Sequence, residues 1–309
     1  MSSVSPVTTN TISVLAALPG DKNMNIEELN NKIPEVLAAT RVIVQHYGHT
    51  KKFAKHIVAL VVKQIKHLTD IELVEFVGTN KIGKMLGYKK MPSDSTFSKV
   101  RERADPGIFE ELNNWILLDR MKGKQVRLLA PDSTDIPAHS HKDKDARWGH
   151  RTPSKREQED ASGDANDMFF GYKLHAISDA ESDMPIGFFI APGNRHDSVF
   201  FHKLFEDAKR KFCIMFGAKL LADSGYDATR IYKELHENNI AAVISINGRG
   251  HRKSEVPKDP EYGKRWAIER IFSRLKGMFG LENNRVVGLK KVSIHIYSCL
   301  IAYLMTYLM

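Results

Sequence analysis

Hydrophobic residues recur three or four positions apart through much of the first 120 residues, with lysines between them. This spacing predicts amphipathic helices, most clearly over 53–68. Asp105-Pro106 marks a further helix start, because Asp caps helix N-termini and Pro fits the first helical turn. We therefore expect a helical domain over 23–124, preceded by a flexible N-terminus over 1–22.

The pattern changes at Gln125, where short runs of β-branched and apolar residues begin to alternate with helical segments. The runs predict five strands, and the polar stretch 139–167 predicts a loop. The expected strands are 126–132, 169–179, 184–193, 218–227 and 240–247, and the helices between them are 197–212 and 229–239. This order predicts an α/β domain over 125–309, with a mixed five-stranded sheet and helices on both faces.

The last 18 residues, Val292 to Met309, contain no Asp, Glu, Lys or Arg. Their length is at the lower limit for a membrane span, but Ser293, His295 and Thr306 dilute their apolar character. We expect a buried core helix here and no association with a membrane.

The chain of 309 residues carries 46 Lys and Arg against 37 Asp and Glu, a net charge of +9. This excess favours nucleic acid as a partner, although an anionic membrane surface or a basic soluble enzyme also fits. Nine lysines and three acids lie between Lys51 and Lys90, which is equally typical of a solvated helix face and of a DNA contact. Two cysteines and an N-terminus without a signal-peptide pattern predict reduced thiols in a cytoplasmic, nucleoid-associated protein.

Two of the expected strands end near a carboxylate, Asp132 in one and Asp223 in the other. Parallel, neighbouring strands would bring both to the same sheet edge, where open α/β sheets place their sites. Taken singly, each Asp is more typical of a residue that caps the following turn. The nearby acids Asp197 and Asp227 are expected to cap helices.

A third acid lies on a helix that we expect to begin at Asp259-Pro260. At about 100° per residue, Tyr262, Arg265, Glu269 and Lys276 share a stripe roughly 60° wide, apart from the apolar face. The apolar face can pack on the sheet while the stripe presents one acid among cations. An exposed ion pair between Arg265 and Glu269 explains the same spacing.

Three carboxylates at one sheet edge would suit phosphodiester cleavage. Two Mg²⁺ ions about 3.5–4 Å apart stabilise the attacking and the leaving oxygen. Mg²⁺ prefers oxygen ligands, and we expect Mn²⁺ to substitute for it. Arg265 and Lys276, beside Glu269, would meet the DNA backbone that approaches the ions. The basic loop residues Arg249, Arg252 and Lys253 favour a further DNA-facing surface.

Several blocks together resemble the insertion-sequence DDE transposases. The spacing Tyr262-x2-Arg265-x3-Glu269-x6-Lys276 is similar to the Tyr-Arg-Glu-Lys signature of that family. The segments 132–134 and 221–227 resemble its two aspartate blocks, and 170–175 and 192–198 resemble the strand and turn between them. The likeness covers about 125–285 strongly and the helical region more weakly, around 91–97.

The resemblance implies an RNase H-like catalytic domain in which Asp132, Asp223 and Glu269 hold the metal ions. It implies that Tyr262, Arg265 and Lys276 contact DNA or order the site. It also implies that the helical domain binds DNA ends or dimerises, and that a homodimer brings together the terminal inverted repeats and target DNA. Asp223 and Glu269 are 46 positions apart, too few for the β-rich insertion of some relatives, so we expect no hairpin step stabilised through one.

We therefore expect a transposase that cuts DNA at the ends of an insertion element and joins the freed 3′-OH to target DNA. Two alternatives stay open. One is an RNase H-like endonuclease that cuts without joining, and the other is a transposase-derived DNA-binding regulator without catalysis. A strand-transfer assay separates the first alternative, and end binding without metal-dependent activity would support the second.

Overall fold

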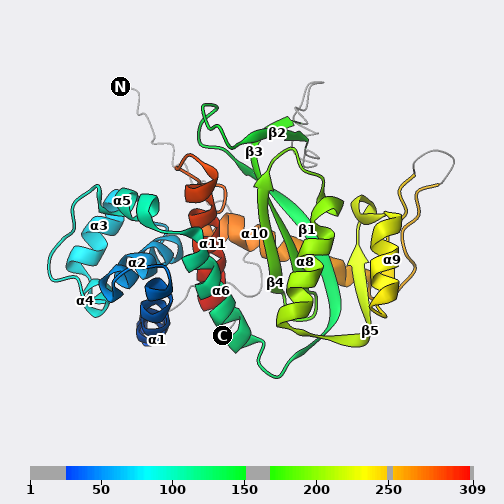
Figure 1. Cartoon of the computed structure of the whole chain (residues 1–309), viewed down its shortest axis with the longest axis horizontal. Helices are drawn as coiled ribbons and strands as arrows, with labels where there is room; N and C mark the ends of the chain where they lie inside the picture. Colours follow the sequence, from blue (N-terminus) through cyan, green and yellow to red (C-terminus); the bar gives the residue numbers. More distant parts are fainter. Residues whose placement is uncertain (1–25, 151–167, 249–252, 307–309) are drawn as a thin grey trace, which may run out of the picture.

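The computed structural model describes residues 26–150, 168–248 and 253–306, and its first part is helical (Figure 1). The segment predicted to be a flexible N-terminus, 1–22, lies outside the described residues. The elements are α1 (Ile26–His46), η1 (Lys51–Phe53), α2 (Ala54–Ile65), α3 (Asp70–Thr79), α4 (Lys81–Leu86), α5 (Thr96–Arg103) and α6 (Pro106–Arg120). The predicted start of α6 is confirmed, because Asp105 Oδ1 accepts a hydrogen bond from Gly107 N at 2.8 Å.

A mixed sheet follows the helices. Its strands are β1 (Gln125–Pro137), β2 (Arg147–His150), β3 (Met168–Asp179), β4 (Met184–Pro192), β5 (Cys213–Ala222) and β6 (Ala241–Ile244). β1, β3 and β4 pair antiparallel, whereas β5 lies parallel to β1 and β6 parallel to β5. The predicted α/β class is confirmed, and this arrangement is that of the RNase H-like fold.

The prediction of five strands, with a loop throughout 139–167, is wrong in one respect. A sixth strand, β2, pairs antiparallel with the beginning of β3, with Arg147 opposite Gly171. Three of its four residues are exposed and only Gly149 is buried, so the strand lacks the apolar alternation that reveals a strand in a sequence. β1 also continues past Asp132 to Pro137, because β3 remains its partner there.

Helices cover both faces of the sheet, as predicted. Figure 1 shows α8 (Asp197–Lys211) in front of the sheet and α10 (Trp266–Phe279) behind it, and both contact β1, β3 and β4. α9 (Thr229–Glu237) packs against β6.

The buried face of α10 includes Ile268, Ile271 and Leu275, the apolar face read from the sequence. Its predicted start at Asp259 is wrong. A 3-10 turn, η3 (Tyr262–Arg265), comes first. The Asp259 carboxylate lies ahead of this turn, where Oδ1 accepts a hydrogen bond from Glu261 N and Oδ2 accepts one from Lys219 Nζ of β5, both at 2.8 Å.

The last helix, α11 (Leu289–Thr306), joins the two halves of the fold. Residues 292–305 are all buried, and the helix contacts α2 and α6 on one side and α10 on the other. The predicted buried core helix is confirmed. In the part of the chain that the structure describes, no helix is long and apolar enough to cross a membrane.

A buried ion network ties the helical part together. The guanidinium of Arg101 on α5 donates two hydrogen bonds to the Asp70 carboxylate on α3, at 2.7 and 2.8 Å, and Lys63 Nζ of α2 lies 2.9 Å from the same carboxylate. Arg101 is buried, whereas the Asp70 side chain is 39% exposed. Burial opposes ionisation of Asp70, but its hydrogen bonds with Arg101 and the two positive charges outweigh burial and lower its pKa.

Asp70→Ala should destabilise the protein by about 2–3 kcal/mol at pH 7, because it leaves Arg101 buried without its partner. This loss is smaller than the loss of about 3–5 kcal/mol typical of a fully buried pair, because water already screens the partly exposed Asp70. Because the folded pKa is lowered, this stabilisation is present above the unfolded pKa of about 3.9 and is lost as the pH falls further. Urea unfolding measures it, and Glu75→Gln, an exposed change on the same helix, should have little effect.

Candidate active site

The two candidate aspartates emerge together because β1 and β5 are parallel neighbours, as the sequence predicts. Leu129 lies opposite Leu220, and Asp132 and Asp223 each follow three residues later. Asp132 remains in β1, opposite Ala176 of β3. Asp223 instead begins the turn η2 (Ser224–Tyr226), where its Oδ1 accepts a hydrogen bond from Gly225 N at 2.9 Å. It therefore both caps a turn and faces Asp132.

Both aspartates lie in an environment that resists a negative charge. Burial raises the pKa of Asp132 to about 7, helped by the charges of Asp223 and Asp197 and opposed by the Ser133 N–H and Arg265. Burial likewise raises the pKa of Asp223, with further contributions from Asp197 and Glu269 and opposition from Gly225 N–H and Arg265. The negative charges of these carboxylates therefore repel one another, and Arg265 offsets that repulsion only in part.

Arg265 supplies positive charge to this space. Its Nη1 lies 2.9 Å from Glu269 Oε1, so the ion pair that the helical spacing allows is formed. The Arg265 side chain is 16% exposed, and its Nε is buried without a hydrogen-bond partner. The same guanidinium lowers the pKa of Asp132 and of Asp223, so one cation lies among three acids.

Glu269 is paired with Arg265 in this structure. Its side chain is 47% exposed, and its Oε1 lies 2.9 Å from Arg265 Nη1. Within the described residues, His202, Glu206 and Glu234 form a group whose possible ligand atoms all lie within 4.8 Å of one another, whereas Asp132, Asp223 and Glu269 do not form such a group. The three candidate acids are therefore not gathered closely enough in this arrangement to share one ion.

Of the predicted DNA-contacting residues, Tyr262 has a clear structural role. Its hydroxyl donates to the Ala222 carbonyl oxygen at 3.2 Å and lies 3.1 Å from Ser245 Oγ, and its ring lies 6.0 Å from the Arg265 guanidinium. It thus links the segment before α10 to the residues that end β5 and follow β6.

Four other residues predicted to contact DNA lie before Tyr262 or after Glu269 in the chain. Lys276 Nζ lies 2.6 Å from Glu282, and Lys253 is exposed. Arg249 and Arg252 lie outside the described residues.

Ion pairs before α10 and along it hold the helix against the sheet. Ahead of the helix, the Glu261 carboxylate accepts hydrogen bonds from Arg127 of β1 at 2.7 and 3.0 Å. Farther along, Arg270 and Arg274 both donate to Asp183, in the turn between β3 and β4, at distances of 2.6 to 3.0 Å. Glu269 is therefore carried by a helix whose position is set by strands on either side of the site.

The prediction that Asp197 and Asp227 cap helices is wrong for both. Asp197 is the first residue of α8, but no side chain caps that helix; its Oδ1 accepts a hydrogen bond from Ser133 Oγ at 2.6 Å. The Asp227 carboxylate accepts from Asn247 N at 2.9 Å, and α9 has no side-chain cap either. Asp197 is thus a fourth acid of the site, and Asp227 fixes the chain after β6.

Sequence reasoning also missed two residues of β3 beside Asp197. Lys173 Nζ lies 3.5 Å and His175 Nδ1 3.4 Å from Asp197 Oδ1. His175 is fully buried, neither ring nitrogen has hydrogen-bond geometry with a partner, and burial lowers its pKa. The two residues are two positions apart and so share one face of the strand, which is the only local signal that could have paired them.

The donor set fits a hard divalent cation. Asp132, Asp223, Asp197 and Glu269 offer carboxylate oxygens, the ligand type that Mg²⁺ prefers. The Tyr226 hydroxyl is buried without a hydrogen-bond partner, and burial, with the charges of Asp132, Asp197 and Asp223, raises its pKa. A cation bound among these groups would relieve the repulsion that raises the pKa values of Asp132 and Asp223.

Comparison with known proteins identifies the family to which the chain belongs. A family model described as "Transposase DDE domain" matches residues 124–305. A search of curated proteins finds no match. Among solved structures, the chain is similar to a piggyBac transposase synaptic complex with hairpin DNA, with a TM-score of 0.41 and 9% identity, covering 83% of this chain and 66% of that one. The chain thus spans just under two thirds of that transposase chain.

The match to the family model covers more than half of the chain and contains all three candidate acids. The resemblance to transposases noted in the sequence is confirmed at this level, whereas the Tyr-Arg-Glu-Lys signature stays a prediction. The chain belongs to the transposase DDE domain family.

Proposed function

We propose that this protein is a DNA transposase that cuts at the ends of an insertion element and joins the freed 3′-OH to target DNA. The observation that carries the proposal is the parallel register of β1 and β5, which sets Asp132 beside Asp223 in a chain of this family. Asp132, Asp223 and Glu269 would be the catalytic acids. Asp197 would support them through Ser133.

The three acids would hold Mg²⁺, with Mn²⁺ able to replace it. Bound there, the ions would activate the attacking oxygen and stabilise the leaving oxygen of the phosphodiester. Asp132 must lose its proton to act as a ligand, because the ionised carboxylate is the form that binds metal. Its raised pKa therefore makes metal binding release a proton near neutral pH.

Arg265 is the residue that we expect to change partner. Its pair with Glu269 is of the i,i+4 type, worth only a few tenths of a kcal/mol on a helix surface. Once Glu269 turns to the metal, the guanidinium would be free to bind a phosphate of the DNA. Tyr262 would keep Arg265 in place, and Lys276, Lys253, Arg249 and Arg252 would contact the backbone farther along.

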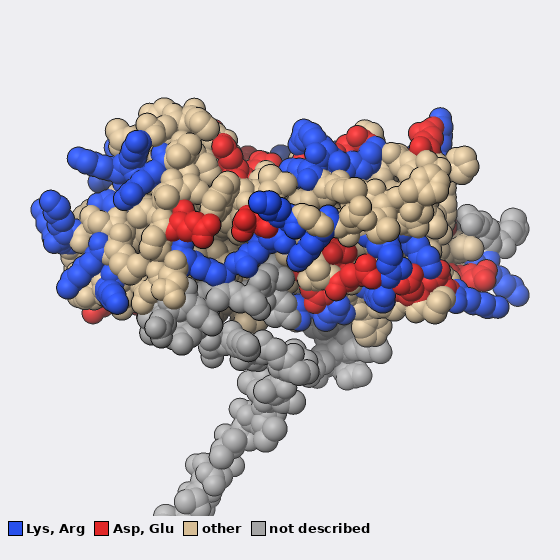
Figure 2. All heavy atoms as spheres, turned by 90° about the horizontal axis from the view of Figure 1, so that it is seen from below, with Lys and Arg blue, Asp and Glu red and all other residues tan. Residues whose placement is uncertain are grey.

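The helical part offers a surface for the terminal inverted repeat. A hollow of about 930 Å³ is lined by six Lys and Arg residues, and no Asp or Glu appears among the described residues that line it. They are Arg41, Lys51, Lys52, Lys55, Lys89 and Lys90. Figure 2 shows Lys and Arg gathered over the helical part, at the left of that view.

These unbalanced charges favour DNA contact over a merely solvated helix face. Burial, together with the charge of Lys52, lowers the pKa of Lys55, as expected for a cation that lacks a nearby acid. A phosphate backbone would supply the missing negative charge. Two copies of the chain, each holding one element end, would form the synaptic homodimer.

Glu269→Gln, Asp132→Asn and Asp223→Asn should each reduce Mg²⁺-dependent cutting at the element ends by roughly 10³-fold or more, about 4 kcal/mol of barrier. End binding should remain. The assay uses supercoiled DNA with the repeats that flank the gene, in Mg²⁺ or EDTA, and Asp119→Asn, an exposed change on α6, is the control. Full cutting by any of the three variants would contradict the assignment.

The same preparations separate the alternatives. Joining of pre-cut ends to a target plasmid would exclude an endonuclease that only cuts. Native protein that binds the ends tightly yet leaves them uncut in Mg²⁺ and Mn²⁺ would instead indicate a regulator.

In EDTA, Asp132→Asn should stabilise the fold more at pH 8 than at pH 4, by about 1–3 kcal/mol. The folded pKa of about 7 lies above the unfolded value near 3.9. Ionisation therefore destabilises the native state increasingly as the pH rises from 4 to 7, and then by a constant amount. Urea unfolding at both pH values measures the difference, and Asp119→Asn should show none.

Lys51→Ala, Lys52→Ala and Lys89→Ala should each weaken binding of the terminal-repeat duplex. Each lost phosphate contact should also reduce the slope of log affinity against log salt by about 0.9. Fluorescence anisotropy in EDTA at several KCl concentrations measures both quantities. Lys233→Ala, which removes an exposed lysine of α9, is the matched control, and an unchanged slope in all three variants would rule out this surface.

A further inference from the structure

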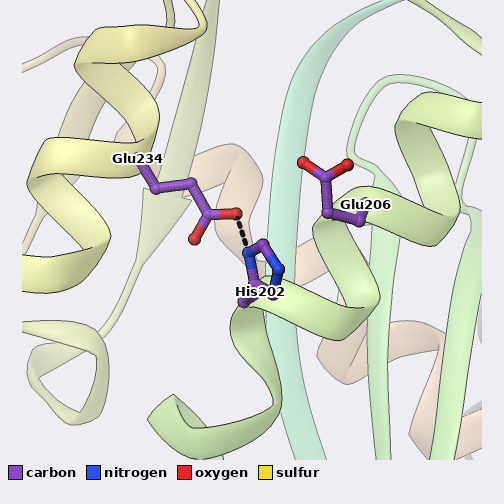
Figure 3. A group of neighbouring side chains, drawn as sticks. All are labelled: His202, Glu206 and Glu234. Atoms are coloured by element: carbon purple, nitrogen blue, oxygen red, sulfur yellow. Dashed lines mark hydrogen bonds and ion pairs between the residues drawn. The ribbon is translucent and has the colours of Figure 1, made fainter.

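A second cluster of ligand-type side chains lies between α8 and α9. His202 and Glu206 are four residues apart on α8, and Glu234 faces them from α9 (Figure 3). One possible ligand atom from each residue lies within 4.8 Å of the other two. From this geometry we propose that His202, Glu206 and Glu234 form a binding site for a divalent transition-metal ion such as Zn²⁺, distinct from the Mg²⁺ site proposed above.

The ligand types select the kind of metal. One imidazole with two carboxylates suits Zn²⁺ and its first-row neighbours, whereas Mg²⁺ prefers oxygen ligands alone. At metal–ligand distances of about 2.0–2.2 Å, tetrahedral ligand atoms lie about 3.4 Å apart. The ligand atoms, which now lie within 4.8 Å of one another, therefore need to move by at most about 1.4 Å to reach this spacing, and the fourth position would be left to water.

The present partners of these side chains are weak competitors for a metal. His202 Nδ1 lies 2.7 Å from Glu234 Oε1, and the His202 side chain is 74% exposed. Glu206 forms a partly exposed pair with Lys209 at 2.7 Å, and solvent screens such surface pairs. Figure 3 shows the His202 ring lying between the two carboxylates, with His202 and Glu206 on one helix and Glu234 on the other.

Glu234 provides the fixed part of the site. Its side chain is only 15% exposed, and its carboxylate is hydrogen-bonded to His202. A metal ion would give this partly buried carboxylate a positive partner. Such a charge is what a desolvated carboxylate requires.

The position of the cluster gives the ion a structural consequence. α8 begins at Asp197, which binds Ser133 next to Asp132, and α9 begins six residues after Asp223. An ion held by both helices would clip together the two elements that flank the candidate active site. Because the ion would bind the native state and not the unfolded chain, it should also raise the melting temperature.

Isothermal titration of the full-length, EDTA-treated and desalted protein with Zn²⁺ tests the site. The titration is performed in an Asp132→Asn, Asp223→Asn background, so that the candidate catalytic acids do not compete. One equivalent of Zn²⁺ should bind, and His202→Ala or Glu234→Gln should weaken it more than about tenfold, since even changes around a metal's ligands cost about 10–100-fold. The controls His236→Ala and Glu237→Gln, exposed residues of α9, should bind normally.

Three results would overturn the proposal: no stoichiometric binding by folded protein, equal binding by His202→Ala and Glu234→Gln, or displacement of Zn²⁺ by excess Mg²⁺. Circular dichroism and the melting temperature in EDTA show whether each variant is folded. Zn²⁺ should raise the melting temperature of the parent and of both controls, but not of the two ligand variants. None of these readouts uses DNA, so the outcome is independent of the proposed transposase activity.

Discussion

The parallel pairing of β1 with β5 is the constraint on which the candidate site depends. Leu129 and Leu220 lie opposite one another in the sheet interior, and this register places Asp132 and Asp223 level with each other three residues later. Side chains alternate between the two faces of a sheet, so a slip of one residue would turn one aspartate away from the other. Burial of the leucine-rich strands therefore fixes the separation of two groups that repel each other. The raised pKa values of Asp132 and Asp223 record the electrostatic cost of that arrangement.

The third acid is positioned by different means. α10 lies on the sheet through its apolar face, and ion pairs with Arg127 and Asp183 fix the chain before and along the helix. Glu269 stands on the exposed flank and is paired with Arg265. A packed helix thus carries a half-exposed carboxylate, paired with a cation, at the edge of the candidate site. Arg265 meanwhile provides the positive charge that the acids lack.

Helix α11 gives the molecule one continuous core instead of two independent halves. Its buried surface is shared between α2 and α6 of the helical part and α10 behind the sheet. The basic hollow of the helical part and the sheet edge that carries the candidate acids consequently belong to one packed body. In the proposed function, one part would bind the duplex and the other the phosphodiester. The hydrophobic character of residues 292–305 is explained by this burial.

Local periodicity and residue chemistry were enough to predict the helical beginning, the five main strands, the apolar face of α10, and Asp132, Asp223 and Glu269 as candidate acids. Which distant segments meet became visible only in the folded chain. Asp197 turns from an expected helix cap into a partner of Ser133, Lys173 and His175 come to lie beside it, and β2 pairs in a stretch without apolar alternation. His202, Glu206 and Glu234 likewise converge from two helices. Such contacts join residues far apart in the chain. The spacing within either segment does not show which partner that segment meets, because the contact depends on how the sheet and helices pack and not on the residues' own neighbours.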